Sequence, residues 1–358
     1  MNVHYRFRNL CINVGVLFSS LLICFLLIEI GLRIIYGNPH IFRSPQVRHI
    51  PTPYGYKPEP NQHGSYTLNK LVTVNSSGFR DTREWIVPKP TGSYRIIIVG
   101  DSFTFGNGVN TEERFSNLLD KYLQKNHGQV EVLNASAGGW NLNNEFFFFN
   151  TEGLSYEPDA LVLAFFPNDW MSPPSPSMPD PVPIANLSQE GRWDARPYWL
   201  RWLPYEWIYK LKYSATVIYL RDRLFLIGAK PDIVTRLLQD QVDLDREPTI
   251  AYSYQKLGEM KQTCDVKGIP MVIAVIPPVN FFWLSDGSPS YIEHFRKFAE
   301  SRGIVFVDLS IGLRMTRAQN LYYNYPWDNH LNPVGHKRVA DQLIPVIEQL
   351  IMPLVRGK

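Results

Sequence analysis

The amino-acid sequence predicts an α/β protein of three layers, in which helices cover both faces of a sheet of about five parallel strands. Five short apolar runs, rich in Val and Ile, alternate along the chain with segments of helical periodicity. Such alternation is typical of parallel strands that are joined by right-handed crossovers. The chain has 358 residues and is 45% hydrophobic, which is enough to bury a full core. We expect the strands at residues 96–99, 130–133, 160–165, 271–276 and 304–307.

The expected helices are recognised by their caps and their apolar stripes. Asn110, with Glu113 three residues later, can cap a helix that continues to about residue 123. Asn332 followed by Pro333 predicts the start of the last helix, and Pro345 should kink that helix. Its buried stripe is expected at Val339, Leu343, Ile347, Leu350 and Ile351. Further helices are expected at residues 141–150, 251–264 and 291–301.

The N-terminus carries a segment that is long and apolar enough to span a membrane. Residues 11–28 contain no charge, and the apolar character continues past Glu29 to residue 36. The apolar region is too long for a cleaved signal peptide and lacks a small-residue cleavage site, which favours an uncleaved signal-anchor over a buried core helix. The flanking arginines, which nearly balance, are Arg6 and Arg8 before the span and Arg33, Arg43 and Arg48 after it. We expect the N-terminus inside and the rest of the chain on the periplasmic or extracellular side of the cell (inner) membrane.

Four regions follow from composition. Residues 1–36 form a short stub and the span, residues 37–93 an extension packed on the core, and residues 94–169 with 250–358 the α/β core. The extension has a hairpin pattern around residues 71–74, with a turn signal at 75–78. Residues 170–249 form an insertion that begins with a proline-rich run, which can continue neither a helix nor a central strand. The aromatic residues of this insertion could line a sugar-binding cleft, lie at a membrane interface or form a small helical core: Trp193, Tyr198, Trp199, Trp202, Tyr205, Trp207, Tyr209 and Tyr213.

Charge and cysteine content exclude several classes of function. The net charge is +3 with acids and bases nearly balanced, so no nucleic-acid surface is predicted. Cys11 and Cys24 lie in the apolar N-terminus, which leaves Cys264 as the one cysteine of the remaining chain. That part can therefore form neither an internal disulfide nor a cysteine-based metal site. No cofactor is implied.

A candidate nucleophile follows the first strand of the predicted sheet. The β-branched run 96–99 ends in Gly100-Asp101-Ser102, and loops beyond the carboxyl ends of parallel strands form the active site in open α/β sheets. A serine hydroxyl needs an imidazole to remove its proton, and the imidazole needs a carboxylate to orient it. Asp328 and His330, two residues apart, supply both groups.

Donors for a developing oxyanion are expected after the next two strands. Residues 134–139 end in Gly138 and Gly139, where a backbone N–H can approach a substrate closely. Asn168 follows the third strand, and its side-chain amide could donate as well. Both loops are also compatible with ordinary turns, because Gly and Asn are common turn formers.

Taken in order, these blocks resemble the SGNH (GDSL-type) hydrolase family, whose fold is a flavodoxin-like α/β/α sandwich. The most specific element is Gly-Asp-Ser-Phe-Thr-Phe-Gly, and the resemblance covers residues 95–351 apart from the insertion. It implies that Ser102 is the nucleophile and first oxyanion donor, that Gly139 rather than Gly138 and Asn168 complete the oxyanion hole, and that Asp101 is structural. By the same resemblance His330 is the base and Asp328 orients it.

The spacing of the last block departs from the common family pattern. Most members carry Asp-x-x-His, whereas here Trp327 stands three residues before His330 and the acid two before it. The shorter Asp-x-His resembles the branch that acts on exported polysaccharides, including alginate O-acetylation proteins. The resemblance therefore implies an esterase for O-acetyl groups of a cell-envelope or exported glycan, held in the membrane through residues 11–36.

Alternatives stay open at this point. The same machinery would suit an O-acyltransferase that is supplied by a membrane acyl-donor protein, a lysophospholipase or lipase, or a glycan-binding or assembly protein with a weakened site. A metal site from Asp328, His330 and His336 is conceivable but lacks further paired ligands. A Gly-x-Ser-x-Gly elbow, a phosphate-binding Gly-x-x-x-x-Gly-Lys loop and a His-Glu-x-x-His motif are all absent from the sequence.

Overall fold

The computed structural model describes residues 2–39, 45–170, 202, 214–220, 236–237, 240–279, 289–313, 322–324 and 326–356. The chain divides into two units, which are described separately. The first consists of residues 1–41 and 196–230, and the second of residues 42–195 and 231–358. Except for Trp202, the aromatic residues named in the expected insertion lie outside the described residues.

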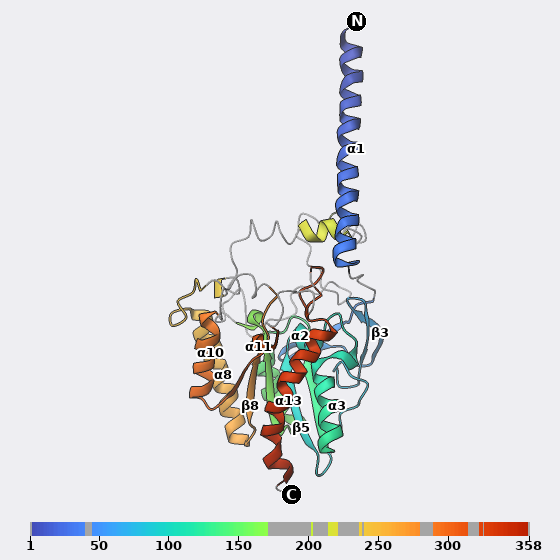
Figure 1. Cartoon of the computed structure of the whole chain (residues 1–358). Helices are drawn as coiled ribbons and strands as arrows, with labels where there is room; N and C mark the ends of the chain where they lie inside the picture. Colours follow the sequence, from blue (N-terminus) through green and yellow to red (C-terminus); the bar gives the residue numbers. More distant parts are fainter. Residues whose placement is uncertain are drawn as a thin grey trace. The chain divides into compact units, whose positions relative to one another are not determined.

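The first unit is dominated by helix α1 (Asn2–Tyr36), the long helix at the N-terminus in Figure 1. Its segment Arg8–Tyr36 has a mean hydropathy of 2.6 and exposes its apolar side chains all around. By length and composition this helix could cross a membrane, either as an anchor or as a signal sequence. The carboxylate of Glu29 accepts hydrogen bonds from the backbone N–H groups of Ala215 and Thr216 and from the hydroxyl of Ser214, so it caps the helical turns at 215–220.

The second unit is built on a five-stranded parallel sheet in the order β6-β5-β7-β8-β9. Among the strands of this sheet, β5 comes first in the sequence and lies between the second, β6, and the third, β7, which is the flavodoxin-like order. The prediction of about five parallel strands is confirmed, and each strand lies within a few residues of its predicted position. The strands are β5 (Tyr94–Gly100), β6 (Val130–Ser136), β7 (Ala160–Phe165), β8 (Met271–Val275) and β9 (Val305–Asp308).

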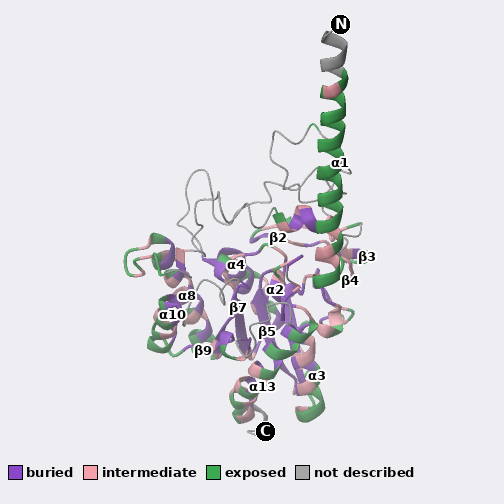
Figure 2. Ribbon diagram, turned by 45° about the horizontal axis from the view of Figure 1, so that its top comes forward, coloured by how far each residue is buried: buried purple, intermediate pink, exposed green. Residues whose placement is uncertain are grey.

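Helices cover both faces of the sheet and complete the three layers (Figure 1). Alternate residues of a strand point to opposite faces: Ile96 and Ile98 of β5 pack with α3 (Phe115–His127) and α13 (Pro333–Arg356), while Ile97 and Val99 face the other layer. That layer contains α4 (Leu142–Thr151), α8 (Pro248–Lys267) and α10 (Ser290–Ser301). Strands β5, β7 and β8 are buried along their whole length, as their continuous apolar sequences require (Figure 2). The edge strand β9 is partly exposed.

Two helices, α3 and α13, differ in detail from the helices predicted after Asn110 and Asn332. Glu113 accepts from the backbone N–H of Asn110 at 2.8 Å as expected, but this cap starts only the 3-10 turn η1 (Thr111–Glu113). Arg114 is extended, so α3 begins at Phe115. Helix α13 continues through Pro345, and four residues of its predicted stripe are buried while Leu350 is partly buried.

The extension forms two antiparallel hairpins, β1 (His49–Thr52) with β2 (Gly55–Pro58) and β3 (Gln62–Thr67) with β4 (Lys70–Val74). The predicted strand at 71–74 is confirmed as part of β4. The hairpin that β4 forms with β3 turns at Leu68 and Asn69, where Leu68 has a φ of 52°. The Asn75 side chain accepts from the backbone N–H of Phe79 at 2.9 Å, so the turn signal at 75–78 closes a separate turn after β4.

Candidate active site

Ser102 lies at the carboxyl end of β5 and begins the short helix α2 (Ser102–Phe105). Asp101 caps this helix, because its Oδ1 atom accepts from the backbone N–H of Phe103 at 2.8 Å. Gly106 ends the helix in the left-handed region, with a φ of 79°. Gly100 has no room for a side chain, because a Cβ there would collide with Thr104. The sequence Gly-Asp-Ser thus turns the chain sharply from strand to helix with the serine at the turn.

The structure brings the predicted nucleophile, base and orienting acid together. His330 Nε2 lies 2.8 Å from Ser102 Oγ, and His330 Nδ1 lies 2.7 Å from Asp328 Oδ1. The backbone N–H of His330 also donates to Asp328 Oδ1, at 2.9 Å. The two-residue spacing therefore closes a tight loop in which one carboxylate oxygen holds both the backbone and the ring of the histidine.

The charge of Asp328 adjusts the basicity of the imidazole. Burial lowers the pKa of His330, but the charge of Asp328 and its hydrogen bond outweigh burial, so the net pKa lies above that of an ordinary histidine. The aromatic ring of Phe103 packs against the imidazole, with centroids 4.7 Å apart, and stacks on Phe166 at 3.9 Å. The imidazole is thus fixed by its hydrogen bonds on two edges and by an aromatic face.

The two further predicted oxyanion donors lie at the ends of the strands that flank β5. Gly139 follows β6, is exposed and has a φ of 82°. Asn168 lies in the 3-10 turn η3 (Pro167–Asp169) after β7 and is also exposed. The side chain of Asn168 is hydrogen-bonded to Asp101. An amide group has two N–H donors, so Asn168 can donate to Asp101 and to one further acceptor.

Three carboxyl groups are buried beneath this site, and the sequence prediction had named only Asp101 among them. Asp101, Glu145 and Asp169 are all completely inaccessible to solvent. Burial raises the pKa of Asp101 to about 6. Burial, together with the charges of neighbouring acids of the trio, raises the pKa of Glu145 and of Asp169 well above the usual range. The signal that was missed is that Glu145 lies on the same face of α4 as the buried Phe148 and Phe149.

A second group that the sequence prediction missed is a pair of buried arginines. The guanidinium of Arg80 donates to the backbone carbonyls of Phe105, Gly106 and Val109 at 2.6–2.9 Å. Arg114 in turn donates to the backbone carbonyl of Arg80 at 2.6 Å. The loop that follows the nucleophile turn is therefore held by a side chain from the extension.

His336 does not join the pair Asp328 and His330. Its Nδ1 atom lies 3.3 Å from the backbone N of Phe115, and the two rings stack. Burial, with the nearby arginine charges, lowers the pKa of His336 to about 3, so its ring is neutral. Within the described ranges, no three His, Cys, Asp or Glu side chains are grouped as metal ligands.

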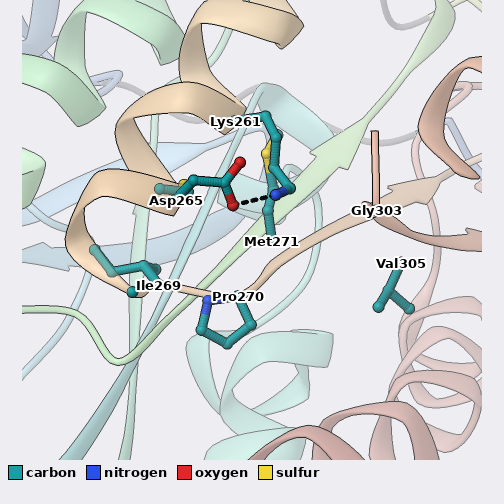
Figure 3. Close-up of a pocket in the computed structure, with 9 residues that line it drawn as sticks. Lys261, Asp265, Ile269, Pro270, Met271, Gly303 and Val305 are labelled. Atoms are coloured by element: carbon teal, nitrogen blue, oxygen red, sulfur yellow. Dashed lines mark hydrogen bonds and ion pairs between the residues drawn. The ribbon is translucent and has the colours of Figure 1, made fainter. Parts of the chain in front are cut away.

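A depression of about 320 Å³ lies elsewhere on the second unit (Figure 3). Met271, the first residue of β8, and Gly303, which precedes β9, contribute to its lining together with Lys261 and Asp265. These positions mark the amino ends of the parallel strands, whereas Ser102 follows the carboxyl end of β5. The depression is thus separate from the candidate active site.

A family model of GDSL-like lipases and acylhydrolases matches residues 98–338, which is more than half of the chain. The chain belongs to this family. The matched span includes Ser102, Gly139, Asn168, Asp328 and His330. Membership in the GDSL family places the chain among the ester hydrolases.

Comparison with curated proteins finds no match. Among solved structures, the chain is similar to a lipase/acylhydrolase from Enterococcus faecalis, at 14% identity over 72% of this chain and 96% of that one, with a TM-score of 0.42. It is also similar to TesA, at 14% identity over 72% and 99% with a TM-score of 0.41. A catalytic variant of an acetylxylan esterase from Geobacillus stearothermophilus matches at 13% identity over 73% and 95%, with a TM-score of 0.40.

Proposed function

We propose that this protein is a serine esterase that acts through an acyl intermediate on Ser102. The observation that carries the proposal is the unbroken series of hydrogen bonds from Ser102 Oγ through both ring nitrogens of His330 to Asp328. These contacts have the geometry in which a base activates a serine hydroxyl and an acid orients the base. Ser102 also lies 3.5 Å from Asp101 Oδ2, but the contact with His330 is shorter and better suited to proton transfer.

Acylation follows from this arrangement. Ser102 Oγ attacks the carbonyl carbon of the ester while its proton passes to His330 Nε2. The carbonyl oxygen becomes an oxyanion, which would accept hydrogen bonds from the backbone N–H groups of Ser102 and Gly139 and from the amide of Asn168. The tetrahedral intermediate then collapses, the carbon–oxygen bond to the alcohol breaks, and His330 gives the proton to the departing alkoxide.

Deacylation repeats the same steps with a second nucleophile. His330 removes a proton from water, which attacks the carbonyl carbon of the acyl-Ser102 ester. The bond from that carbon to Ser102 Oγ then breaks, His330 returns the proton to Oγ, and the carboxylic acid leaves. A sugar hydroxyl in place of water would give acyl transfer, because the base and the oxyanion donors serve either nucleophile. The chemistry therefore requires no cofactor.

We propose O-acetyl groups on a cell-envelope or exported glycan as the substrate. The Asp-x-His spacing of Asp328 and His330, which resembles that of exported-polysaccharide proteins, supports this class. Helix α1 supports a protein that is anchored in the cell membrane. We propose that the catalytic unit lies on the periplasmic or extracellular side. A reporter fused to the C-terminus tests this orientation: activity only in a cytoplasmic reporter assay would overturn it.

The serine mechanism is tested with the full-length protein in detergent, using 4-nitrophenyl acetate and labelling by a fluorophosphonate. Ser102→Ala should abolish both turnover and labelling while thermal unfolding stays unchanged. Ser93→Ala is a matched control, because Ser93 lies just before the opposite end of β5 and its hydroxyl donates to the carbonyl of Pro90 at 2.7 Å. Undiminished turnover by Ser102→Ala would remove the proposal.

The substrate class is tested with acetylated oligosaccharides, their deacetylated forms as acceptors, and lysophospholipids. Release of acetate from the acetylated sugars is the expected result. Transfer of acetyl groups to the acceptor faster than to water would assign an O-acyltransferase, and selective turnover of lysophospholipids would assign a lipase. Glycan binding without labelling of Ser102 would instead indicate a binding protein.

A further inference from the structure

The candidate oxyanion loop contains a tight turn whose central peptide joins Gly138 and Gly139. The backbone N–H of Trp140 donates to the carbonyl of Ala137 at 3.2 Å, which closes a four-residue turn over 137–140. Gly139 occupies the third position with a φ of 82°, the value required there by a type II turn. In the alternative type I turn the central peptide points the opposite way. The direction of the Gly139 N–H therefore depends on which form the turn adopts.

Tyr56 of the extension selects one of these two forms. Its hydroxyl donates to the carbonyl oxygen of Gly138 at 2.9 Å. That carbonyl and the N–H of Gly139 belong to the same trans peptide and so point in opposite directions. The hydrogen bond from Tyr56 thereby directs the Gly139 N–H away from the tyrosine, on a residue that is exposed.

Tyr56 is itself held in place by the same loop. The indole Nε1 of Trp140 donates to the backbone carbonyl of Tyr56 at 2.7 Å, so strand β2 and the turn bind one another in both directions. Two residues before Tyr56, the backbone carbonyl of Tyr54 accepts a hydrogen bond from the side-chain amide of Asn144 in α4 at 2.8 Å. This bond fixes the start of β2 beside α4 (Figure 2). Burial, with the charge of Asp101, raises the pKa of Tyr56, so its hydroxyl stays protonated and remains a donor.

We propose that Tyr56 is a positioning residue that holds the Gly138–Gly139 peptide with the Gly139 N–H toward the developing oxyanion. The inference rests on the proposed esterase function, in which this N–H is one of the oxyanion donors. Glycine at both central positions permits either form of the turn, because glycine tolerates both signs of φ. Without the hydroxyl of Tyr56, the peptide is free to rotate and the donor is lost for part of the time.

The test is Tyr56→Phe, which removes the hydroxyl and keeps the ring. Loss of an oxyanion donor costs about a hundredfold or more in kcat, so partial loss of its orientation should cost about tenfold. We expect KM for 4-nitrophenyl acetate to stay within about twofold, because the donor acts mainly in the transition state. The rate of fluorophosphonate labelling should fall in parallel, since the phosphoryl oxygen occupies the oxyanion site.

Tyr54→Phe is the matched control. Tyr54 lies on the same hairpin and is buried, and its ring packs on Trp140 of the turn, but its hydroxyl donates to Glu152 at 2.5 Å rather than to a carbonyl of the turn. We expect this variant to keep its kcat even if its thermal unfolding temperature falls. An equal loss of kcat in both variants would overturn the inference, because the hydroxyl of Tyr56 would then matter only for stability.

Gly139→Ala provides an independent variant of the same peptide. It keeps the N–H, but a side chain is strained at a φ of 82°, and its Cβ would approach the Tyr56 hydroxyl to 2.9 Å. It should therefore favour the flipped turn and lower kcat. If both variants act through one peptide, the double variant should be no slower than the slower single variant. Multiplication of the two losses would overturn the inference.

The outcomes separate this inference from the function on which it rests. If Ser102→Ala is inactive but Tyr56→Phe retains kcat within about twofold of the wild type, only the role of Tyr56 is wrong. If Ser102→Ala retains its activity, the proposed function itself is wrong.

Discussion

Replacing Asp328 by Asn tests whether an acid two residues before His330 stabilises the charge of that histidine during turnover. Asp328 Oδ1 accepts from both the ring Nδ1 and the backbone N–H of His330, at 2.7 and 2.9 Å. An Asn side chain has nearly the same shape and can still accept one of these hydrogen bonds. The substitution therefore removes the charge that stabilises the imidazolium while it leaves the loop in place.

The expected loss of kcat in Asp328→Asn can be calculated from the geometry of the ion pair. Opposite charges about 4 Å apart interact by about 4 kcal/mol at the effective dielectric constant of a protein surface, which corresponds to about three orders of magnitude in rate. The side chains of His330 and Asp328 are 19% and 16% exposed, so solvent screens part of this interaction. We expect Asp328→Asn to lower kcat by about 10²- to 10³-fold.

The dependence of kcat on pH gives a second readout. His330 must be neutral to act as a base, so the rate falls as the pH drops through the pKa of His330. Because Asp328 raises that pKa, its removal should move the acid limb of the profile to lower pH. A profile that keeps its acid limb in place would mean that Asp328 does not set the basicity of His330.

Asp245→Asn is a matched control for the rate measurement. Asp245 also pairs with a histidine, since its Oδ1 lies 3.2 Å from His294 Nε2, and that pair sits on α10 and the segment before α8. Turnover of 4-nitrophenyl acetate by this variant should equal that of the wild type. If Asp328→Asn retained kcat within about threefold, the assignment of Asp328 as the orienting acid would be refuted.

Two further predictions concern stability, measured by urea unfolding. Burial, with the charge of Asp101, raises the pKa of Glu145, so the folded protein keeps this carboxyl protonated. The wild type therefore loses stability as the pH rises above the pKa of the unfolded carboxyl. The free energy of unfolding of Glu145→Gln should rise relative to that of the wild type by up to about 1.4 kcal/mol for each pH unit above about 5. A constant difference between pH 5 and 8 would contradict this, and Glu152→Gln, whose carboxylate pairs with Lys57 at 2.9 Å, serves as the control. Arg80→Met removes the guanidinium donor from three buried backbone carbonyls, of which only that of Gly106 keeps a backbone donor, the N–H of Val109 at 3.3 Å, among the described hydrogen bonds. It should destabilise the fold by about 3 kcal/mol or more, so an unchanged urea midpoint would argue against it.

The sheet and the residues at its carboxyl edge could be predicted because they depend on local patterns. A buried parallel strand is a short run of apolar residues, and its end is marked by the polar or glycine residues that follow. Ser102, Gly139 and Asn168 each follow such a run, so their approach to one edge of the sheet was expected from the order of the strands. The contact between Asp328 and His330 could be predicted for the same reason, since both residues lie in one short loop.

The contributions of the extension could not be predicted in this way. Arg80 and Tyr56 act through hydrogen bonds to backbone carbonyls that lie 25 or more residues further along the chain. A backbone carbonyl leaves no trace in the side-chain pattern, and an arginine or tyrosine in a loop is usually exposed. The buried trio of acids was hidden for a related reason, because a charged residue within an apolar helix gives no indication of which other acids the fold places beside it.

These contacts bear on where the catalytic unit begins. Composition separates the extension from the core near residue 93, yet the hydrogen bonds of Tyr56 to Gly138 and of Arg80 to the nucleophile loop cross that boundary. The side chain of Arg95, in β5, likewise donates to the carbonyl of Ile86 at 3.1 Å. A chain that started at residue 94 would keep Ser102, His330 and Asp328. It would lose Tyr56, which binds the turn at 137–140, and Arg80, which binds the loop after Ser102. The extension, with its two hairpins, therefore belongs to the architecture of the candidate active site, because residues 94–358 alone lack the side chains of Tyr56 and Arg80.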